Sequence, residues 1–368
     1  MPYNILVINP GSTSDDIGYY RGETAVFDLK IDYTHAELAP FEGKNVTEMA
    51  PLKKKMILSL LQKHNVPPGE INAVIGRGGL VKPLKGGSYR VNEALIKDLK
   101  SGDYGIHASN LGGILAADIA AEIGCPSLIS DAVVVDELSP LARYSGMPQL
   151  PRISIFHALN QRRVAFLAAQ KMGRKYEDCN FIVMHAGGGV SCGAHIKGKV
   201  VDVNNALDGE GPMSPQRAGT LPAGGLARLC FGGKESFKDI YLKIKGRGGV
   251  FAYCGTHDMR VVSKYIDTGE KDPALTCTRE EAKEVREAMI YQFAKAIGAL
   301  AAVAQGDLDA IVLTGGLMGN PYVRETLQNK VAWLKVPVHV FPGSDEKAAL
   351  REAAVRALDN PSTINEYK

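Results

Sequence analysis

The alternation of apolar and polar positions predicts short strands at the start of the chain and again past its middle. Residues 4–8 form an apolar run that ends in a turn of small residues, and two further strands follow, joined at Arg21-Gly22. The segment 180–203 has the same order, with its last two strands joined at Lys197-Gly198. Strands connected by such short turns form hairpins, so each segment is predicted to be an antiparallel unit of three strands.

These two segments form an internal repeat. The stretch "NILVINPGSTSDDIGYYRGETAVF" (4–27) aligns without gaps on "NFIVMHAGGGVSCGAHIKGKVVDV" (180–203). Few residues are identical, but strands, turns and the polar residue at the end of the first strand coincide throughout. A repeat of this kind predicts a duplicated architecture.

Helical periodicity follows each copy of the repeat. In the first half we predict helices at 52–64, 92–100 and 110–124. In the second half, a helix begins with the capping box Thr278-x-x-Glu281 and ends at Gly306. Further strands are predicted at 73–75, 128–130 and 310–313. Mixed sheets flanked by helices, occurring twice, predict an α/β protein of two lobes.

Composition agrees with two lobes and narrows the function. A chain of 368 residues exceeds one domain of about 150 residues. No apolar run reaches the roughly 18 residues of a membrane span, and the start lacks signal-peptide features, so we expect a cytoplasmic protein without membrane contacts. The densest basic run, Lys53-Lys54-Lys55, has no interleaved aromatic residues, which favours a solvated helix face over a nucleic-acid surface. The six cysteines are far apart, which favours reduced thiols.

Three glycine-rich turns are candidates for phosphate binding. The turns 11–14 ("GSTS") and 187–189 ("GGG") occupy equivalent places in the repeat, and "TGG" (314–316) follows a predicted strand. Small residues expose backbone amides that bind anionic oxygens. A single such turn mostly just reverses the chain, but two equivalent loops from two lobes could bind a triphosphate together.

Several long stretches resemble the acetate and butyrate kinase family, and most closely its butyrate kinase branch. They run in order over nearly the whole chain: "VINPGSTS" (7–14), "GRGGL" (76–80), "HASNLGG" (107–113), "DAVVVDEL" (131–138), "SIFHALNQ" (154–161), "HAGGGVSCGAH" (185–195), "VDVNNALDGEGPMSPQRAGTLPAGGL" (201–226) and "LTGGL" (313–317). The resemblance implies a duplicated, actin-like ATPase fold, which is also described as ribonuclease H-like. It implies an N-terminal lobe at 1–153, completed by a C-terminal helix at 345–368, and a C-terminal lobe at 154–344 that carries the second phosphate loop and an adenosine-binding motif.

The same resemblance implies a phosphotransferase that makes acyl phosphate and ADP from ATP and a short-chain fatty acid, reversibly, with Mg²⁺ as a cofactor. The implied catalytic residues are Arg77, His107, Asp131, His185 and Arg217, with Asp131 and Glu346 as metal ligands. The implied nucleotide-binding residues are Asn9, Gly11, Ser12, Thr13, Ser14, Gly187, Gly188, Gly189, Thr314, Gly315 and Gly316. A homo-oligomer, a dimer or a multiple of dimers, is implied by analogy.

Alternatives remain at this stage. Gly78 and Gly79 beside Arg77 favour an acyl chain longer than acetate, with an acetate or propionate kinase as the alternative. His157 lies in a matching stretch but on a predicted helix, where a packing role is an equal alternative. Asp16 stands where the family carries lysine, so a nucleotide-binding pseudokinase or a regulatory actin-like ATPase is the competing hypothesis. Our preferred hypothesis is that Mg²⁺ or a neighbouring cation holds the inward carboxylate of the Asp15-Asp16 pair.

Overall fold

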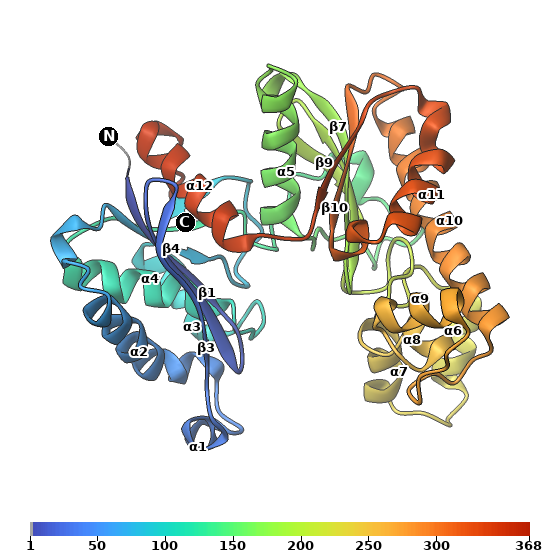
Figure 1. Ribbon diagram of the computed structural model, residues 1–368, viewed down its shortest axis with the longest axis horizontal. Coiled ribbons are helices and arrows are strands. Elements are labelled where there is room, and N and C mark those ends of the chain that lie inside the picture. Colours follow the sequence, from blue (N-terminus) through green and yellow to red (C-terminus); the bar gives the residue numbers. More distant parts are fainter. Residues whose placement is uncertain (1–2) are drawn as a thin grey trace. The chain divides into compact units, whose positions relative to one another are not determined.

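The computed structural model describes residues 3–368, which divide into two compact units (Figure 1). Unit 1 comprises Met1–Asp136 together with Asp345–Lys368, and unit 2 comprises Glu137–Ser344. The resemblance implies a change of lobe at 153/154, whereas the first compact unit ends at Asp136 and the second begins at Glu137. The segment expected to return to the first lobe, 345–368, does belong to unit 1.

Unit 1 is a mixed sheet with helices on both faces. Its strands are β1 (Asn4–Pro10), β2 (Ser14–Arg21), β3 (Thr24–Asp32), β4 (Ala73–Arg77), β5 (Ser88–Arg90) and β6 (Ser127–Ser130), in the order β3-β2-β1-β4-β6-β5. The strands β1, β2 and β3 are antiparallel, while β4 and β6 run parallel to β1. The helices are α1 (His35–Leu38), α2 (Ala50–Lys63), α3 (Glu93–Ser101), α4 (Asn110–Ile123) and α12 (Glu346–Asp359). Figure 1 shows α12 on one side of the sheet and α2 and α4 on the other.

Unit 2 repeats this order. Its strands are β7 (Asn180–Ala186), β8 (Val190–Ile196), β9 (Lys199–Val203), β10 (Ala310–Gly315) and β11 (Val338–Pro342), in the order β9-β8-β7-β10-β11. As in unit 1, the first three are antiparallel, and the next two run parallel to the central strand. The duplication predicted from the repeat is therefore confirmed, with β5 as an additional edge strand in unit 1.

The helices of unit 2 cover both faces of its sheet. They are α5 (Ala158–Lys171), α6 (Ala223–Phe231), α7 (Phe237–Lys245), α8 (Val250–Cys254), α9 (Met259–Thr268), α10 (Arg279–Val303) and α11 (Pro321–Val331). Side chains alternate along β7, so Phe181 and Val183 pack in the core beside α5, and Ile182 and Met184 in the core beside α10. The capping box predicted at Thr278 begins α10.

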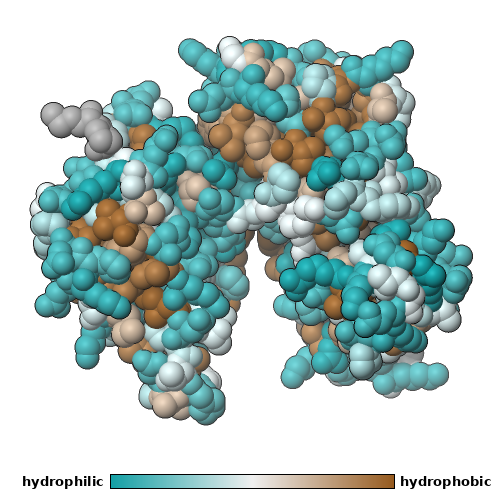
Figure 2. All heavy atoms as spheres, viewed as in Figure 1, coloured by the Kyte–Doolittle hydropathy of each residue, from teal (hydrophilic) through white to brown (hydrophobic). Residues whose placement is uncertain are grey.

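The visible surface is mostly hydrophilic and the cysteines are unpaired. Hydrophilic side chains cover most of the visible face of each unit, with apolar patches between them (Figure 2). All six cysteines are free thiols. Within residues 3–368, none of the helices combines the length and the apolar character that crossing a membrane requires.

Candidate active site

The carboxyl ends of three parallel strands bring together polar residues in unit 1. Asn9 lies near the end of β1, Arg77 ends β4, and Asp131 follows β6, whose last residue Ser130 is the register partner of Arg77. Glu346, the first residue of α12, accepts hydrogen bonds at Oε2 from Asn9 Nδ2 (2.9 Å) and Arg77 Nη1 (2.8 Å). The edge of a parallel sheet at its carboxyl ends is the usual place for a ligand site in α/β proteins.

Two further features of this edge concern Asp131 and His107. Asp131 has the left-handed φ of 42°, and its Oδ1 accepts a hydrogen bond from Gly87 N (2.7 Å). Backbone strain of this kind is concentrated at functional sites. His107 Nδ1 accepts from Ser109 N (3.2 Å), so the neutral ring carries its proton on Nε2. Burial, and then the charge of Arg77, lowers the pKa of His107, which favours that neutral form.

The glycines beside Arg77 have a structural reason that the sequence did not reveal. A Cβ on Gly78 would lie 2.5 Å from Ala132 Cβ, and one on Gly79 would lie 2.6 Å from Asn110 Cα. Both contacts are too close for a side chain, so local packing against Ala132 and Asn110 requires glycine at these positions. The argument that these glycines leave room for a longer acyl chain therefore loses its basis.

A buried ion pair lies beneath the glycine-rich loop at 11–14. Lys53 Nζ of α2 contacts Asp15 Oδ1 at 2.6 Å, and both side chains are fully buried. Lys53 also donates to Gly11 O (3.1 Å), while Asp15 accepts from Gly11 N (3.2 Å) and from the hydroxyl of Tyr33 (2.5 Å). The expectation of a solvated lysine face is thus wrong for Lys53, although Lys55 is exposed. Asp15 anchors the loop and does not face a ligand.

Asp16 faces the opposite side of the sheet from Asp15, as strand alternation requires. Its side chain is 44% exposed, and Lys347 Nζ of α12 lies 4.0 Å from its Oδ1. Lys347 also pairs with Asp28 on β3. Each carboxylate therefore has a neighbouring cation, Lys53 for Asp15 and Lys347 for Asp16, although a cation was expected only for the inward one of the pair.

Each glycine-rich loop is closed by a backbone hydrogen bond from its first residue and leaves two amides unused. Gly11 N donates to Ser14 O (2.7 Å) and Gly187 N to Gly189 O (3.0 Å), so these two amides are consumed within their own turns. The amides of Ser12, Thr13, Gly188 and Gly189 make no hydrogen bond to any residue between 3 and 368. Each loop thus presents two adjacent N–H donors, an arrangement that binds anions.

Arg217 lies directly against the second loop. A Cβ on Gly189 would fall 2.1 Å from Arg217 Nη1, so a larger residue there would displace the guanidinium from the loop. Burial lowers the pKa of the guanidinium, and its Nε is buried with no hydrogen-bond partner in the described chain. Its Nη1 donates to the carbonyl of Ala206. No carboxylate among residues 3–368 forms an ion pair with this half-buried cation, so it is suited to bind an anion beside the loop.

Two histidines stack beside this loop. His185 lies near the end of β7 and His157 immediately precedes α5; their ring centroids are 3.9 Å apart and the planes differ by 9°. Burial, and then the charge of Arg217, lowers the pKa of His185 to about 4, so its ring is neutral at pH 7. His185 Nδ1 lies 2.8 Å from Asn160 Oδ1. Sequence reasoning treated a packing role for His157 as an equal alternative, and only the tertiary contact reveals its place beside His185.

The third glycine turn borders a large cavity of unit 2. Thr314 is the register partner of His185. Gly315 has a φ of 95°, and a Cβ at this position would lie only 2.3 Å from Ala186 O, so no side chain fits there. A cavity of about 810 Å³ lies between Gly187 and Gly188 on one side and Gly316 and Asn320 on the other. Its volume is within the range of small-molecule sites.

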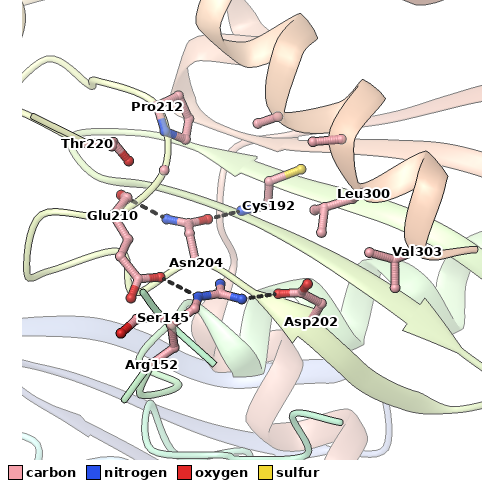
Figure 3. A pocket seen from close by; sticks show the side chains of 13 residues that line it. Ser145, Arg152, Cys192, Asp202, Asn204, Glu210, Pro212, Thr220, Leu300 and Val303 are labelled. Atoms are coloured by element: carbon pink, nitrogen blue, oxygen red, sulfur yellow. Dashed lines mark hydrogen bonds and ion pairs between the residues drawn. The ribbon is translucent and has the colours of Figure 1, made fainter. Parts of the chain in front are cut away.

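A second cavity of unit 2, about 460 Å³, has a different character (Figure 3). Arg152 lies between Asp202 (2.9 Å) and Glu210 (3.2 Å), and Asn204 joins the Glu210 carbonyl to the Cys192 amide. Leu300 and Val303 of α10 form an apolar wall. Because two carboxylates outnumber the single positive charge of Arg152, this cavity does not suit an anion. Its hydrogen bonds instead connect β8 and Arg152 to Asn204 and Glu210, which belong to the loop that leads to Arg217.

The donor set in unit 1 suits Mg²⁺ only if phosphate or water completes the shell. Asp131 and Glu346 both lie at the carboxyl-end edge of the unit 1 sheet. Within residues 3–368, however, there is no group of three or more His, Cys, Asp or Glu side chains placed to hold a metal. Mg²⁺ typically takes one or two carboxylates and fills its octahedron with phosphate oxygens and water. The residues present therefore fit a metal that arrives with a nucleotide.

Comparison with known sequences identifies relatives over the full length. A family model described as the acetokinase family matches residues 152–345. A probable butyrate kinase of Elusimicrobium minutum is 54% identical over 370 residues, covering 100% of both chains. Butyrate kinase 2 of Clostridium acetobutylicum is 46% identical over 368 residues, again with 100% of both chains covered.

Solved structures share the fold. The acetate kinase of Porphyromonas gingivalis superimposes with a TM-score of 0.75 at 21% identity, over 97% of this chain and 100% of that one. A propionate kinase of Francisella tularensis gives a TM-score of 0.70 at 20% identity, over 95% and 98% of the two chains. The predicted fold class, two mixed sheets flanked by helices in duplicate, is thus confirmed.

Proposed function

Because this chain belongs to the acetokinase family, we propose that it is a butyrate kinase, which transfers the γ-phosphoryl group of ATP to the carboxylate of butyrate or a branched relative and also catalyses the reverse reaction. The products are an acyl phosphate and ADP. The observation that carries the proposal is the similarity to proteins named butyrate kinase, which covers 100% of this chain and of each relative. The acyl preference rests on that similarity alone, since packing accounts for Gly78 and Gly79.

We assign the phosphates of the nucleotide to the two loops. The unused amides of Ser12 and Thr13 in unit 1, and of Gly188 and Gly189 in unit 2, support this assignment. Gly11, Ser14 and Gly187 form the hydrogen bonds that close the two turns. Asn9, which precedes the first turn, is held in place by its hydrogen bond to Glu346. We assign the nucleoside to the cavity beside Thr314, Gly315 and Gly316.

The transfer itself needs positioning and charge stabilisation more than proton chemistry. A substrate carboxylate is already anionic and requires no general base, but it must approach an anionic phosphoryl group. Arg217, half-buried and without a carboxylate partner in the described chain, is suited to stabilise the transferred group, and Arg77 to orient the substrate carboxylate. Asp131 and Glu346 would hold Mg²⁺, which neutralises phosphate charge when it is bound.

Three histidines complete the proposed site with different proton arrangements. Neutral His107 offers the proton on Nε2. His185, in its neutral form, directs Nδ1–H to Asn160, so it can donate from Nε2 only as an imidazolium or after the Asn160 amide turns. An anionic phosphoryl group nearby favours both changes. We add His157 to this site because its ring stacks on that of His185.

The contacts of Asp15 and Asp16 weaken the main argument for a non-catalytic nucleotide sensor, although Asp16, the register partner of Asn9, lies on the same face of the sheet as that residue. Asp15 is neutralised by buried Lys53, and Asp16 lies beside Lys347. We also expect assembly into a homo-oligomer and residence in the cytoplasm, with which six free thiols agree.

The test is formation of acyl phosphate from Mg-ATP and straight or branched acids of two to five carbons, trapped with hydroxylamine. We expect the highest kcat/KM with butyrate or a branched four- or five-carbon acid. Arg217→Ala should lower kcat by roughly a hundredfold or more, whereas the exposed Arg228→Ala should leave it unchanged. A preference for acetate would refute the substrate, and absence of product with ATP bound would refute the activity.

A further inference from the structure

A chain of buried hydrogen bonds begins at His157 and leads away from the proposed site. His157 Nδ1 lies 2.8 Å from Ser191 Oγ of β8, and Ser191 Oγ lies 2.7 Å from Gln161 Nε2 of α5. Gln161 Oε1 lies 2.9 Å from His195 Nε2, and His195 Nδ1 lies 2.8 Å from the hydroxyl of Tyr176. Apart from His157, all these side chains are at most 2% exposed.

The direction of every bond in this chain follows from one backbone carbonyl. Gln161 Nε2 also donates to Ser191 O at 3.0 Å. If the amide were turned, two oxygens would face each other, so the Gln161 nitrogen must point to Ser191 and its oxygen to His195. His195 is neutral because burial, and then Arg162, lowers its pKa to about 3. It therefore donates from Nε2 to Gln161 and accepts from Tyr176 at Nδ1.

The same reasoning extends to the other end. Ser191 Oγ accepts from Gln161 Nε2 (2.7 Å) and from the backbone amide of His157 (3.4 Å), which uses both of its lone pairs. Its own proton is therefore directed to His157 Nδ1. An Nδ1 that accepts a hydrogen bond leaves the proton of the neutral ring on Nε2. The stacked neighbour His185 differs, because no second hydrogen bond from residues 3–368 holds the Asn160 amide in one orientation.

We propose that Gln161 and Ser191 are positioning residues for phosphoryl transfer, which together keep the proton of neutral His157 on Nε2 and hold its ring against His185. The inference rests on the proposed function, in which His157 belongs to the site. His157 is then a donor whose proton position is set in advance, whereas His185 can change its donor and acceptor roles. A preorganised donor needs no rearrangement as charge develops on the transferred group.

The first measurement concerns the protonation of the ring and needs no activity. Long-range ¹H–¹⁵N correlation spectra of the full chain with ¹⁵N-labelled histidine distinguish protonated from unprotonated ring nitrogens. We expect His157 and His195 to carry protons on Nε2 and none on Nδ1 at pH 7. A protonated Nδ1 on His157 would overturn the proposal.

The second measurement compares two buried hydroxyl groups of the same chain. Ser191→Ala removes the donor to His157, and we expect a roughly five- to tenfold fall in kcat with little change in KM, together with mixed His157 tautomers. Gln161→Met should shift the His157 signals in the same way. Tyr176→Phe removes a hydroxyl that lies beyond His195 and should leave both kcat and the His157 signals unchanged.

The outcomes separate the two proposals. Equal losses of kcat in Ser191→Ala and Tyr176→Phe would reduce the chain to a structural role and overturn the inference. A wild-type protein that forms no acyl phosphate would refute the proposed function, while the spectra would still decide how the chain is oriented.

Discussion

Replacing Lys53 with methionine tests whether the buried ion pair supports the first phosphate loop. Methionine keeps the length of the side chain but removes the charge and the hydrogen bonds to Asp15 Oδ1 and Gly11 O. Breaking a buried pair by removing one partner typically costs about 3–5 kcal/mol, because the other charge remains buried. Tyr33 and Gly11 N still donate to Asp15, so we expect a loss of about 3 kcal/mol in the free energy of unfolding of unit 1.

Asp15→Asn should cost less than Lys53→Met. Burial already lowers the pKa of Lys53, and without Asp15 the amine can lose its proton and avoid a buried charge. The double variant removes both charges, so its cost should fall below the sum of the single costs by about 2 kcal/mol. The matched control is Lys55→Met, an exposed position of the same helix, with an expected change below about 0.5 kcal/mol.

The assay must report on unit 1 separately. The single tryptophan, Trp333, belongs to unit 2, so its fluorescence is unsuitable. Hydrogen exchange of β1 and β2 amides in increasing urea measures the local free energy of unfolding. We also expect Lys53→Met to raise the KM for ATP severalfold, since Gly11 loses its anchor. Equal stability of the Lys53→Met and Lys55→Met proteins would refute the reasoning.

Three further predictions concern pH, a glycine and the acidic residue after the loop. His185 and His195 have folded pKa values near 4 and 3, below the unfolded value of about 6.5. The unfolded state therefore binds more protons below pH 6.5, and stability should fall as the pH drops toward 4 by about 1.4 kcal/mol per pH unit for each histidine. Urea midpoints measure this slope, and His195→Gln should make it shallower; an unchanged slope would contradict the assignment. Gly315→Ala should destabilise unit 2 by about 2 kcal/mol or more because of its φ of 95° and the contact with Ala186. Gly316→Ala, with open space around the new methyl group, should change stability by less than about 0.5 kcal/mol, and equal effects in denaturation would argue against the local geometry. Asp16→Asn should change the KM for ATP by less than about twofold, since the side chain is partly exposed and its ion pair is weak; a large change in the ATP or Mg²⁺ saturation curve would mean that Asp16 takes part in binding.

Local sequence patterns determined the secondary elements and the duplication of the fold. The strand at Ala73–Arg77 and the helix that begins after Thr278 were predictable because strand periodicity and a capping box act through neighbouring residues. The repeat between β1 and β7 likewise predicted equal strand orders. The family resemblance then named Arg217 and His185 as candidates, although it could not reveal the proton arrangement of the histidine.

The tertiary structure alone decided which polar residues support the site from behind. Nothing in the run Lys53-Lys54-Lys55 marks the first lysine as buried, because its partner Asp15 lies on a different element. His157 was equally ambiguous until α5 and β7 brought its ring onto His185. Gly78 and Gly79 were misleading, since the atoms that exclude a side chain there belong to Ala132 and Asn110, on distant segments. Charge pairing, stacking and close packing depend on distances between segments, and those distances exist only once the chain has folded.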